Sequence, residues 1–504
     1  MKFSAHKRQA RGQRGAHRRR GKGLDHLGMG LRFATLASAL LMTACSKQVQ
    51  LPVHEFQVPA PATWKGAATE PGTSGSDWWA YLEVPGLDDA IRKALDCSQS
   101  LRAAAARIEA AAQERLIVGA ADWPEINVGA SRLRQRQNFV GLPFPGFSDQ
   151  VLKSTYSNAG LTFNIAWEAD LWNRLSSQKL AADAGIAARE ADRLGVRLSL
   201  SGQVAKAWIA AIEAHGQIES ARALVEHLET VEEWTQERYL QGSLSLVDVR
   251  VAKSDIERAR AVVRERTRAR DLFVRQVEML ACEYPAGERV PTTELPPLPP
   301  QVPAGLPSEL VQRRPDLIAA EQALLAADAR IVEARAALRP SFALTTAAGT
   351  ASNRLLDLVN PSLQAWSYAL GFAQPLFNRG KLKANIRVSE ARSQEVAANY
   401  ESLMWAAFLE VESALVSEQT LRDQQSALRD SQRTTREAIE LAEQRYTAGM
   451  GDVFPIFALQ RAILETESAV LALQRARIDT RVDLHLALGG GFDDPPPSRP
   501  TQDP

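Results

Sequence analysis

The side chains best suited to chemistry in this 504-residue chain are three cysteines and a few scattered histidines. Cys45, Cys97 and Cys282 have no Cys-x-x-Cys spacing, which excludes a zinc knuckle and a dithiol redox motif. The histidines of the body lack the HExxH, GxSxG or P-loop context of a metalloprotease, hydrolase or nucleotide-binding enzyme. They are His54, His215, His227 and His485. The sequence therefore predicts a protein that is not an enzyme and that needs no metal or cofactor.

Cys45 ends a segment with the pattern of a bacterial export signal. Residues 1–44 carry ten Lys or Arg and one acid, and the apolar or small run 33–44 leads directly into Cys45. A basic region, an apolar core and small residues before a cysteine resemble a lipoprotein signal peptide, whose cysteine is acylated and becomes the first mature residue. The alternative is an ordinary small residue in a short buried helix. Met1 and Met29 are both candidate start sites, because Met29 would begin a signal of ordinary length.

Composition places the rest of the chain among globular proteins. Hydrophobic residues make up 45% and charged residues 24%, and no run reaches the 18 or so apolar residues of a spanning helix. The net charge of +1 conceals an asymmetry, because the chain after residue 44 has 50 basic against 58 acidic residues. An acidic body argues against a nucleic-acid partner.

The mature chain contains an internal twofold repeat. Three landmarks recur in the same order, at separations of 205 to 216 residues. They are 101–124 with 317–340, 170–174 with 375–379, and 238–242 with 445–449. We expect six segments: the signal peptide (1–44), an acylated N-terminus with an extended linker (45–87), a first repeat (88–290), a Pro-rich linker (291–310), a second repeat (311–490) and a disordered tail (491–504).

Each repeat contains two predicted β-strands. Apolar and small or polar residues alternate along 158–167 and 366–373, which is the period of a strand with two different faces. Antiparallel partners are expected at 126–136 and 341–350, across loops at 137–155 and 351–365. Strands of about ten residues with aromatic ends suit a bilayer-crossing strand, although half-buried hairpins of a soluble sheet fit the alternation equally well.

Long helices follow the strands in both repeats. No proline interrupts 174–239 or 379–446, and each stretch would form on the order of 100 Å of helix. Gly242 and Gly449 should reverse the chain into second helices that end near Ala281 and Leu488. Four strands cannot close a barrel, so membrane-spanning strands would have to complete one with other chains.

Several sequence motifs together make residues 45–490 resemble the TolC-like outer-membrane efflux proteins, in their lipoprotein branch. These motifs are the lipobox, Asp77-Trp78-Trp79, 167–172, 305–310 with Arg313-Arg314-Pro315-Asp316, Pro375-Leu376-Phe377 and two Arg-Tyr-x-x-Gly tips. The resemblance implies a mixed α/β membrane protein: a homotrimer with a 12-stranded transmembrane β-barrel, four strands per chain, continuing into a long periplasmic α-barrel. For Arg314, Pro315 and Asp316 we favour helix capping and an equatorial ion pair over a transport role.

The implied function is a passive exit duct of a tripartite efflux system, for drugs or other toxic small molecules. Its partners would be a periplasmic adaptor protein and an inner-membrane transporter of the RND type, and Ser46 after the acylated cysteine favours sorting to the outer-membrane lipid. A secretion exit channel and a coiled-coil lipoprotein scaffold without a channel remain alternatives. The adaptor is expected at the two hairpin tips, which contain Arg238, Tyr239, Gly242, Arg445, Tyr446 and Gly449.

The resemblance also implies a periplasmic gate. In relatives, an Asp just after the first tip accepts hydrogen bonds from a Tyr and an Arg of the second, and Asp248 and Tyr446 occupy the matching positions. The Arg position is Gly451, and the acidic constriction is reduced to Asp452, so we expect a weaker latch here. The alternative for Asp248 is a solvated acid at a helix start, favoured by the helix dipole.

The last expectation concerns the two remaining cysteines. Cys97 and Cys282 would lie in the equatorial belt of the implied architecture, at the start of one helix and the end of another. A disulfide is possible in the oxidising periplasm, but we favour two independent buried cysteines.

Overall fold

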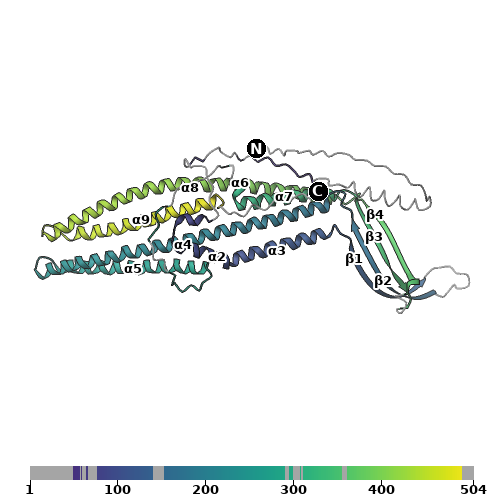
Figure 1. Cartoon of the computed structure of the whole chain (residues 1–504), viewed down its shortest axis with the longest axis horizontal. Coiled ribbons are helices and arrows are strands. Elements are labelled where there is room, and N and C mark those ends of the chain that lie inside the picture. Colours follow the sequence, from purple (N-terminus) through teal and green to yellow (C-terminus); the bar gives the residue numbers. More distant parts are fainter. Residues whose placement is uncertain are drawn as a thin grey trace, which may run out of the picture.

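The protein is described here from a computed structural model of the whole chain (Figure 1). The structure describes residues 49–56, 58, 64–65, 77–139, 152–289, 294–298, 307, 310–354 and 360–490. The expected signal peptide, Cys45 and the tail lie outside these residues. The described part is an elongated body of parallel and antiparallel helices with a curved sheet at one end.

Two 67-residue helices run the length of the helical body, α4 (Arg174–Leu240) and α8 (Lys381–Thr447). In the half near the sheet they pack with α3 (Gln99–Ala120) and α7 (Pro315–Ala336). In the far half they pack with α5 (Leu246–Leu280) and α9 (Phe454–Ala487). The predicted pair of long helices, each followed by a returning helix, is confirmed.

Local sequence explains where these helices begin and turn. Ser98 accepts a hydrogen bond from the backbone N–H of Leu101 and so caps α3, whereas α7 has Pro315 in its first turn. Gly242 and Gly449 have φ of +76° and +77°, the left-handed conformation that ends a helix and favours glycine. The predicted turns at both glycines are therefore present.

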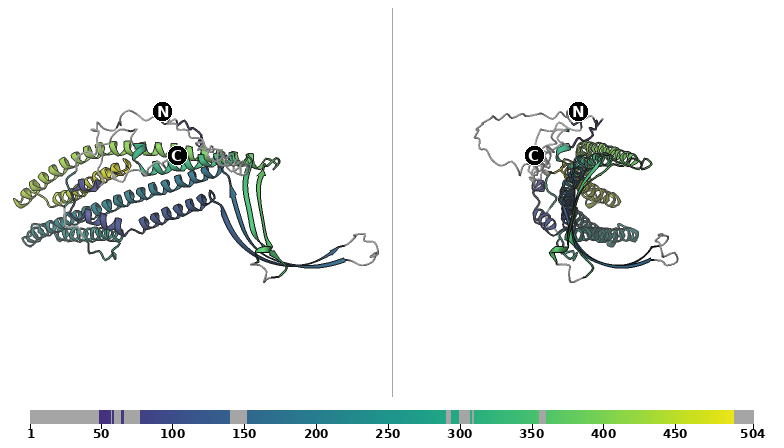
Figure 2. Two further views of the ribbon diagram at one scale, coloured as in Figure 1. Left: turned by 45° about the vertical axis from the view of Figure 1, so that its right-hand side comes forward. Right: turned by 90° about the vertical axis from the view of Figure 1, so that its right-hand side faces the viewer.

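The four strands form one antiparallel sheet in the order β1-β2-β3-β4. The strands are β1 (Glu125–Phe139), β2 (Leu152–Glu168), β3 (Ser341–Ser352) and β4 (Gln364–Ala373). Both predicted hairpins are confirmed, and the first is longer than expected because β1 and β2 stay paired up to Phe139 and Leu152. β2 also pairs with β3, which joins the two repeats into one sheet. This longer hairpin continues past β3 and β4 in Figure 2.

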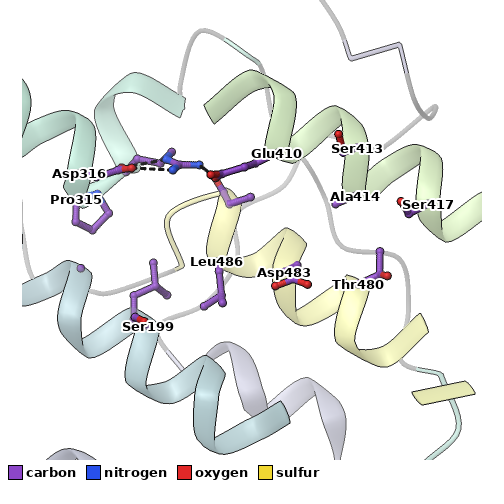
Figure 3. A pocket seen from close by; sticks show the side chains of 14 residues that line it. Ser199, Pro315, Asp316, Glu410, Ser413, Ala414, Ser417, Thr480, Asp483 and Leu486 are labelled. Atoms are coloured by element: carbon purple, nitrogen blue, oxygen red, sulfur yellow. Dashed lines mark hydrogen bonds and ion pairs between the residues drawn. The ribbon is translucent and has the colours of Figure 1, made fainter. Parts of the chain in front are cut away.

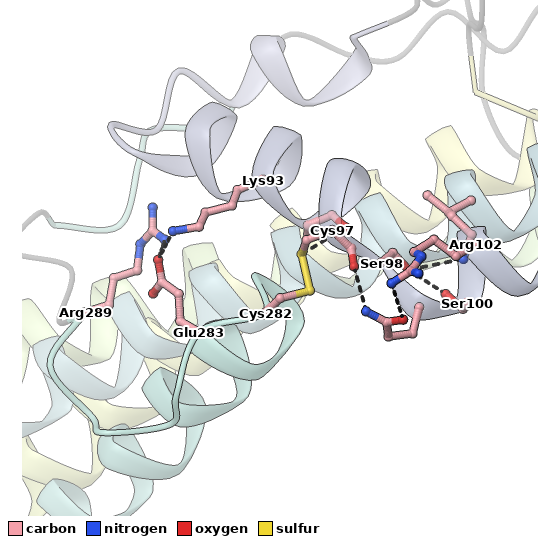
Figure 4. The surroundings of a disulfide bond; sticks show 11 residues. Lys93, Cys97, Ser98, Ser100, Arg102, Cys282, Glu283 and Arg289 are labelled. Carbon is pink, nitrogen blue, oxygen red and sulfur yellow. Dashed lines mark hydrogen bonds and ion pairs between the residues drawn. A yellow bond between two sulfur atoms is a disulfide. The ribbon is translucent and has the colours of Figure 1, made fainter.

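At the middle of the body, the start of α3 meets the end of α5, and the start of α7 meets the end of α9. The helix α2 (Leu87–Cys97) precedes α3, and a disulfide joins Cys97 to Cys282, just beyond the end of α5 (Figure 4). Their Cα atoms lie 6.2 Å apart. The favoured expectation of two independent cysteines is wrong, because the fold brings the start of α3 and the end of α5 together.

The second repeat makes the equivalent junction without a disulfide. Gly489 corresponds to Cys282 in the repeat, and both residues have a positive φ after a long helix. A Cβ added to Gly489 would lie 2.6 Å from the carbonyl oxygen of Arg313, so the two backbones touch there. One junction is thus closed by a covalent bond and the other by a glycine contact.

The core is concentrated around this middle belt. One cluster joins η1 (Trp78–Leu82) and α2 to α4 and includes Trp78, Leu87, Ile209 and Ile212, each at most 2% exposed. A second cluster joins α8 to the end of α9. A third joins the two helical hairpins, α4–α5 and α8–α9, near their tips. The belt therefore holds the long helices together, while the sheet and the tips extend away from it.

Candidate functional site

The tips of the two helical hairpins, α4–α5 and α8–α9, lie at the end of the body farthest from the sheet. Both tips have the same local structure. The N–H groups of Gly242 and Ser243 donate to the carbonyl oxygens of Tyr239 and Arg238, at 2.9 Å each. Gly449 and Met450 repeat this pattern one repeat later. No atom lies within 4 Å of a Cβ built on either glycine, so both tips present open backbone at their outer ends.

Asp248 acts locally at the start of α5. Its carboxylate accepts hydrogen bonds from the backbone N–H and the hydroxyl of Ser245, at 2.8 Å each, which completes a capping box. The structure of this chain does not contain the expected bond to Tyr446. The hydroxyl of Tyr446 has no hydrogen-bond partner among the described residues. Asp248 is thus used as the helix-start acid, because Ser245 lies three residues away and satisfies its carboxylate first.

Arg238 makes the contact between the hairpins that was expected of Asp248. Its guanidinium carbon lies 4.0 Å from the ring centroid of Tyr446, and one guanidinium nitrogen donates to the carbonyl oxygen of the same residue. The Tyr446 side chain is 1% exposed, inside the third hydrophobic cluster with Val231 and Ile456. A cation over an aromatic face contributes about 0.5–2 kcal/mol. The first hairpin therefore holds the second through Tyr446.

The remaining predicted gate residue, Asp452, is exposed at the second tip. Its carboxylate accepts a hydrogen bond of 3.3 Å from the N–H of Phe454, before α9 begins. A Cβ on the neighbouring Gly451 would lie 3.1 Å from the backbone nitrogen of Tyr446. The tip is packed closely at this point, which explains why a small residue fits the position.

Arg314 organises the second helix junction. Its guanidinium donates two hydrogen bonds to Asp316, at 2.7 and 3.0 Å, one of 2.5 Å to Glu410 and one of 3.2 Å to the carbonyl of Ala487. Burial lowers the pKa of Arg314, but the two carboxylates outweigh it and raise the pKa above its usual value. The structure contains an ion pair between Arg314 and Asp316, with Pro315 between them in the first turn of α7.

A pocket of about 640 Å³ lies next to this ion pair, between α4, α7, α8 and α9. Figure 3 shows Asp316 and Glu410 on one side of the pocket, with Ser199 of α4 and Asp483 of α9 on its other sides. Because the charge of Arg314 is already balanced by two carboxylates, the pocket has no unpaired cation that would bind an anion. Its geometry indicates a structural joint, not a binding site.

The sheet has two chemically different faces. On one face, Phe342, Leu344, Leu370 and Phe372 lie among the larger apolar residues, and Leu370 is 77% exposed. The opposite face of the same strands is small or polar, with Ala343, Thr345 and Gly371 among others. An exposed apolar face opposite a polar face is the pattern of a strand between lipid and water. Among the residues that the structure describes, no strand pairs with the outer edges of β1 and β4.

An extended N-terminal segment lies along α8. Its first anchor is His54, whose Nε2 is 3.0 Å from a carboxylate oxygen of Asp328, which also accepts a 2.6 Å hydrogen bond from Ser393. Further on, Phe56 packs edge-on against Tyr400, with 5.2 Å between the centroids of the two rings. The motifs identified in the sequence do not include this polar cluster, because its three residues come from three separate segments.

The described residues have neither a membrane-spanning helix nor a cluster of metal ligands. None of their helices has an 18-residue stretch apolar enough to cross a membrane. Within the same residues, no group of three or more His, Cys, Asp and Glu side chains has the arrangement of a metal site.

Comparison with known proteins agrees with this geometry. Residues 90–277 and 306–490 match the family model described as outer membrane efflux protein. The outer membrane protein OprJ of Pseudomonas aeruginosa is 30% identical over 467 residues, which cover 92% of this chain and 96% of OprJ. The cation efflux system protein CusC of Escherichia coli is 27% identical over 465 residues, covering 90% of this chain and 97% of CusC.

Solved structures give the same result. The open state of the MtrE outer membrane channel of Neisseria gonorrhoeae superposes with a TM-score of 0.76 at 28% identity, over 88% of this chain and 98% of that one. The CmeC outer membrane channel of Campylobacter jejuni, at 21% identity, has a TM-score of 0.80 and shows the shared fold. With the family model matched over both repeats, the chain belongs to the outer membrane efflux protein family.

Proposed function

We propose that the protein is the passive exit duct of a tripartite efflux system, through which an inner-membrane transporter of the RND type expels small toxic molecules. The observation that carries this proposal is the sheet, whose apolar outer face and polar inner face continue directly into a helical body long enough to reach deep into the periplasm. OprJ and CusC are named as an outer membrane protein and a cation efflux protein, which supports the function without fixing the substrate.

The duct would be a homotrimer with twelve strands. The free edges of β1 and β4 support this, because unpaired backbone groups in lipid cost several kcal/mol each. The repeat supplies a second argument at the tips. Arg238 of the first hairpin holds Tyr446 of the second, and their repeat equivalents are Arg445, which is exposed, and Tyr239, which is half-buried. In a ring of hairpins, Arg445 of one chain would hold Tyr239 of the next.

The tips are the proposed adaptor site. They lie farthest from the sheet, and their glycines leave the backbone open to close approach by another helical hairpin. Gly242→Trp and Gly449→Trp should abolish efflux and leave the trimers intact, with Gly287→Trp as a control outside the tips. Unchanged drug susceptibility in both tip variants would contradict an adaptor site here.

The same tips would form the periplasmic gate. Tyr446 keeps its proposed role, with Arg238 as its partner within the chain, and Asp248 contributes by fixing the start of α5. The exposed Asp452 would be the acidic group at the opening.

Acylation of Cys45 would anchor the chain in the outer membrane. His54 contacts the hydroxyl of Ser393 on α8 at 3.4 Å, and further along the same helix the carboxylate of Glu412 accepts a 2.9 Å hydrogen bond from the N–H of Lys65. His54 therefore lies nearer the sheet end of α8 than Lys65 does. His54 is nine positions after Cys45, a distance along the chain that can span about 30 Å, whereas Ser393 is about 18 Å along α8 from its start. Equal incorporation of labelled palmitate in the wild type and Cys45→Ser would contradict this anchor.

One experiment separates the duct from its alternatives. Purified trimers should migrate differently on unboiled and boiled gels and should conduct ions in planar bilayers. A scaffold without a channel would give no conductance. A secretion channel would conduct, but deleting its gene would leave drug and solvent susceptibility unchanged.

A further inference from the structure

The apolar face of the sheet changes abruptly into a row of arginines. Arg132, Arg134 and Arg136 alternate along β1, on the same face as Ile126 and Val128, which are 65% and 63% exposed. All three arginines are exposed, and none has an ion-pair or hydrogen-bond partner among the described residues. A period-two run of three unpaired cations directly beyond an apolar face calls for an anionic partner on that face.

The neighbouring strand leaves these cations free and adds another. Arg132 pairs with Ala159, Arg134 with Ser157 and Arg136 with Thr155, so small side chains flank each arginine. Two residues beyond Thr155, Lys153 lies on the same face and is also exposed.

No negative charge of the described sheet offsets this group. The only acids in the four strands are Glu125 and Glu168, at the opposite end next to the helices, and Glu168 is paired with Arg174. Among the described residues of the sheet, four positive charges on this part of the outer face thus have no acidic side chain beside them.

The position of the row along the strands matches the edge of a bilayer. Phe342 and Phe372 pair at the helical end of the apolar face, and Ser352, ten residues further along β3, pairs with Ala159, which in turn pairs with Arg132. Ten residues at about 3.3 Å, tilted by about 40°, rise about 25 Å, which is the height of the apolar band of a membrane barrel. The arginines begin where the hydrocarbon of the outer leaflet would end.

We propose that Arg132, Arg134 and Arg136, with Lys153, bind the phosphate groups of the glycolipid in the outer leaflet. The inference rests on the proposed membrane-spanning role of the sheet. Guanidinium groups bind phosphate through paired, charge-assisted hydrogen bonds, and the face on which they lie is continuous with the lipid-facing residues. A soluble phosphate would not need this continuity, so the lipid headgroup is the ligand that both the charge and the placement favour.

The test uses trimers purified from outer membranes in mild detergent, with bound lipid A measured by mass spectrometry. The variant R132Q/R134Q/R136Q should carry at least about fivefold less lipid A per chain than the wild type. R132K/R134K/R136K should keep at least half, because the charges remain. The matched control R268Q/R429Q/R433Q removes three exposed arginines from the helical body and should not change the lipid content.

A second measurement does not depend on the variants folding. Wild-type trimers in phosphatidylcholine nanodiscs should bind lipid A at least about fivefold more tightly than dephosphorylated lipid A, and inorganic phosphate at 1 mM should not displace it. Equal binding of the two lipids, or wild-type lipid content in a glutamine variant that still forms conducting trimers, would overturn the inference. Because conductance is measured on the same preparation, a failure of the lipid site is distinguished from a failure of the duct.

Discussion

Arg238 and Tyr446 join the two hairpins of one chain, with the guanidinium carbon 4.0 Å from the centroid of the tyrosine ring. The same guanidinium donates to the carbonyl oxygen of Tyr446, so both the ring and the backbone of the second tip are held by the first. Within this chain the two tips are therefore held together by Arg238 and Tyr446, whereas the carboxylate of Asp248 is bonded to Ser245 of its own tip.

Removing the guanidinium should loosen the tips. Arg238→Ala loses a cation–π contact and a charge-assisted hydrogen bond, which together contribute about 1–3 kcal/mol per chain. We expect severalfold higher conductance of purified trimers. Arg258→Ala, which removes an exposed arginine paired within its own helix, is the control and should behave like the wild type. A wild-type conductance in Arg238→Ala would place the gate elsewhere.

The hydroxyl and the ring of Tyr446 should have separable effects. Because the hydroxyl has no partner among the described residues, Tyr446→Phe should keep the wild-type conductance, whereas Tyr446→Leu loses the aromatic face and should resemble Arg238→Ala. Single-channel recordings of the two variants measure the difference. A large increase in the Phe variant would show that the hydroxyl holds the gate after all.

Asp248 should matter for the stability of the tip. Asp248→Ala and Ser245→Ala each remove half of the capping box and should each cost about 1 kcal/mol, seen as faster amide exchange over residues 243–250. Neither change should raise the conductance as much as Arg238→Ala. If Asp248→Ala opened the channel and Ser245→Ala did not, the carboxylate would have a role beyond its cap.

The disulfide should stabilise the middle belt. Cys97 and Cys282 close a loop of 185 residues, and a bridge of this kind contributes about 2–5 kcal/mol. Cys97→Ser, Cys282→Ser and the double variant should all unfold at the same lower temperature, and reductant should lower only the wild-type value. Intact-mass measurement after alkylation without reductant should find neither cysteine modified, and two adducts would rule the bond out.

His485 should make the belt sensitive to acid. Burial, with a smaller effect from the charge of Arg481, lowers the pKa of His485 to about 4 from its usual 6.5. The folded state therefore keeps the imidazole neutral. The contribution of His485 to the free energy of unfolding is constant above pH 6.5 and falls as the pH drops from 6.5 to 4. The loss should reach about 3 kcal/mol per chain by pH 4. In thermal unfolding between pH 4 and 7, His485→Gln should show a smaller acid shift than the wild type, and an equal shift in both would exclude this histidine as its source.

The elements of the fold could be predicted because their signals are local. The alternation along 158–167 identified a strand, and the proline-free stretch after Arg174 identified a long helix, since each pattern depends only on neighbouring residues. Gly242 and Gly449 marked the turns for the same reason, as positions where a left-handed backbone is needed.

The contacts between distant segments could not be predicted in this way. The pairing of Cys97 with Cys282 depends on how two helices meet at the belt, and the sequence alone left it open. At the tips, the resemblance selected Asp248 for Tyr446, but a serine three residues away satisfies the carboxylate and Arg238 reaches the ring instead. The alternating arginines of β1 were visible in the sequence, but their meaning depends on the register that places them beyond the apolar face.

The central claim, that three copies of this chain form a passive exit duct, is tested most directly by recording purified wild-type protein in planar bilayers. The account predicts discrete channel openings from the heat-modifiable trimer, with severalfold larger openings in Arg238→Ala. A correctly folded trimer that never conducts, in the wild type or in this variant, would contradict it.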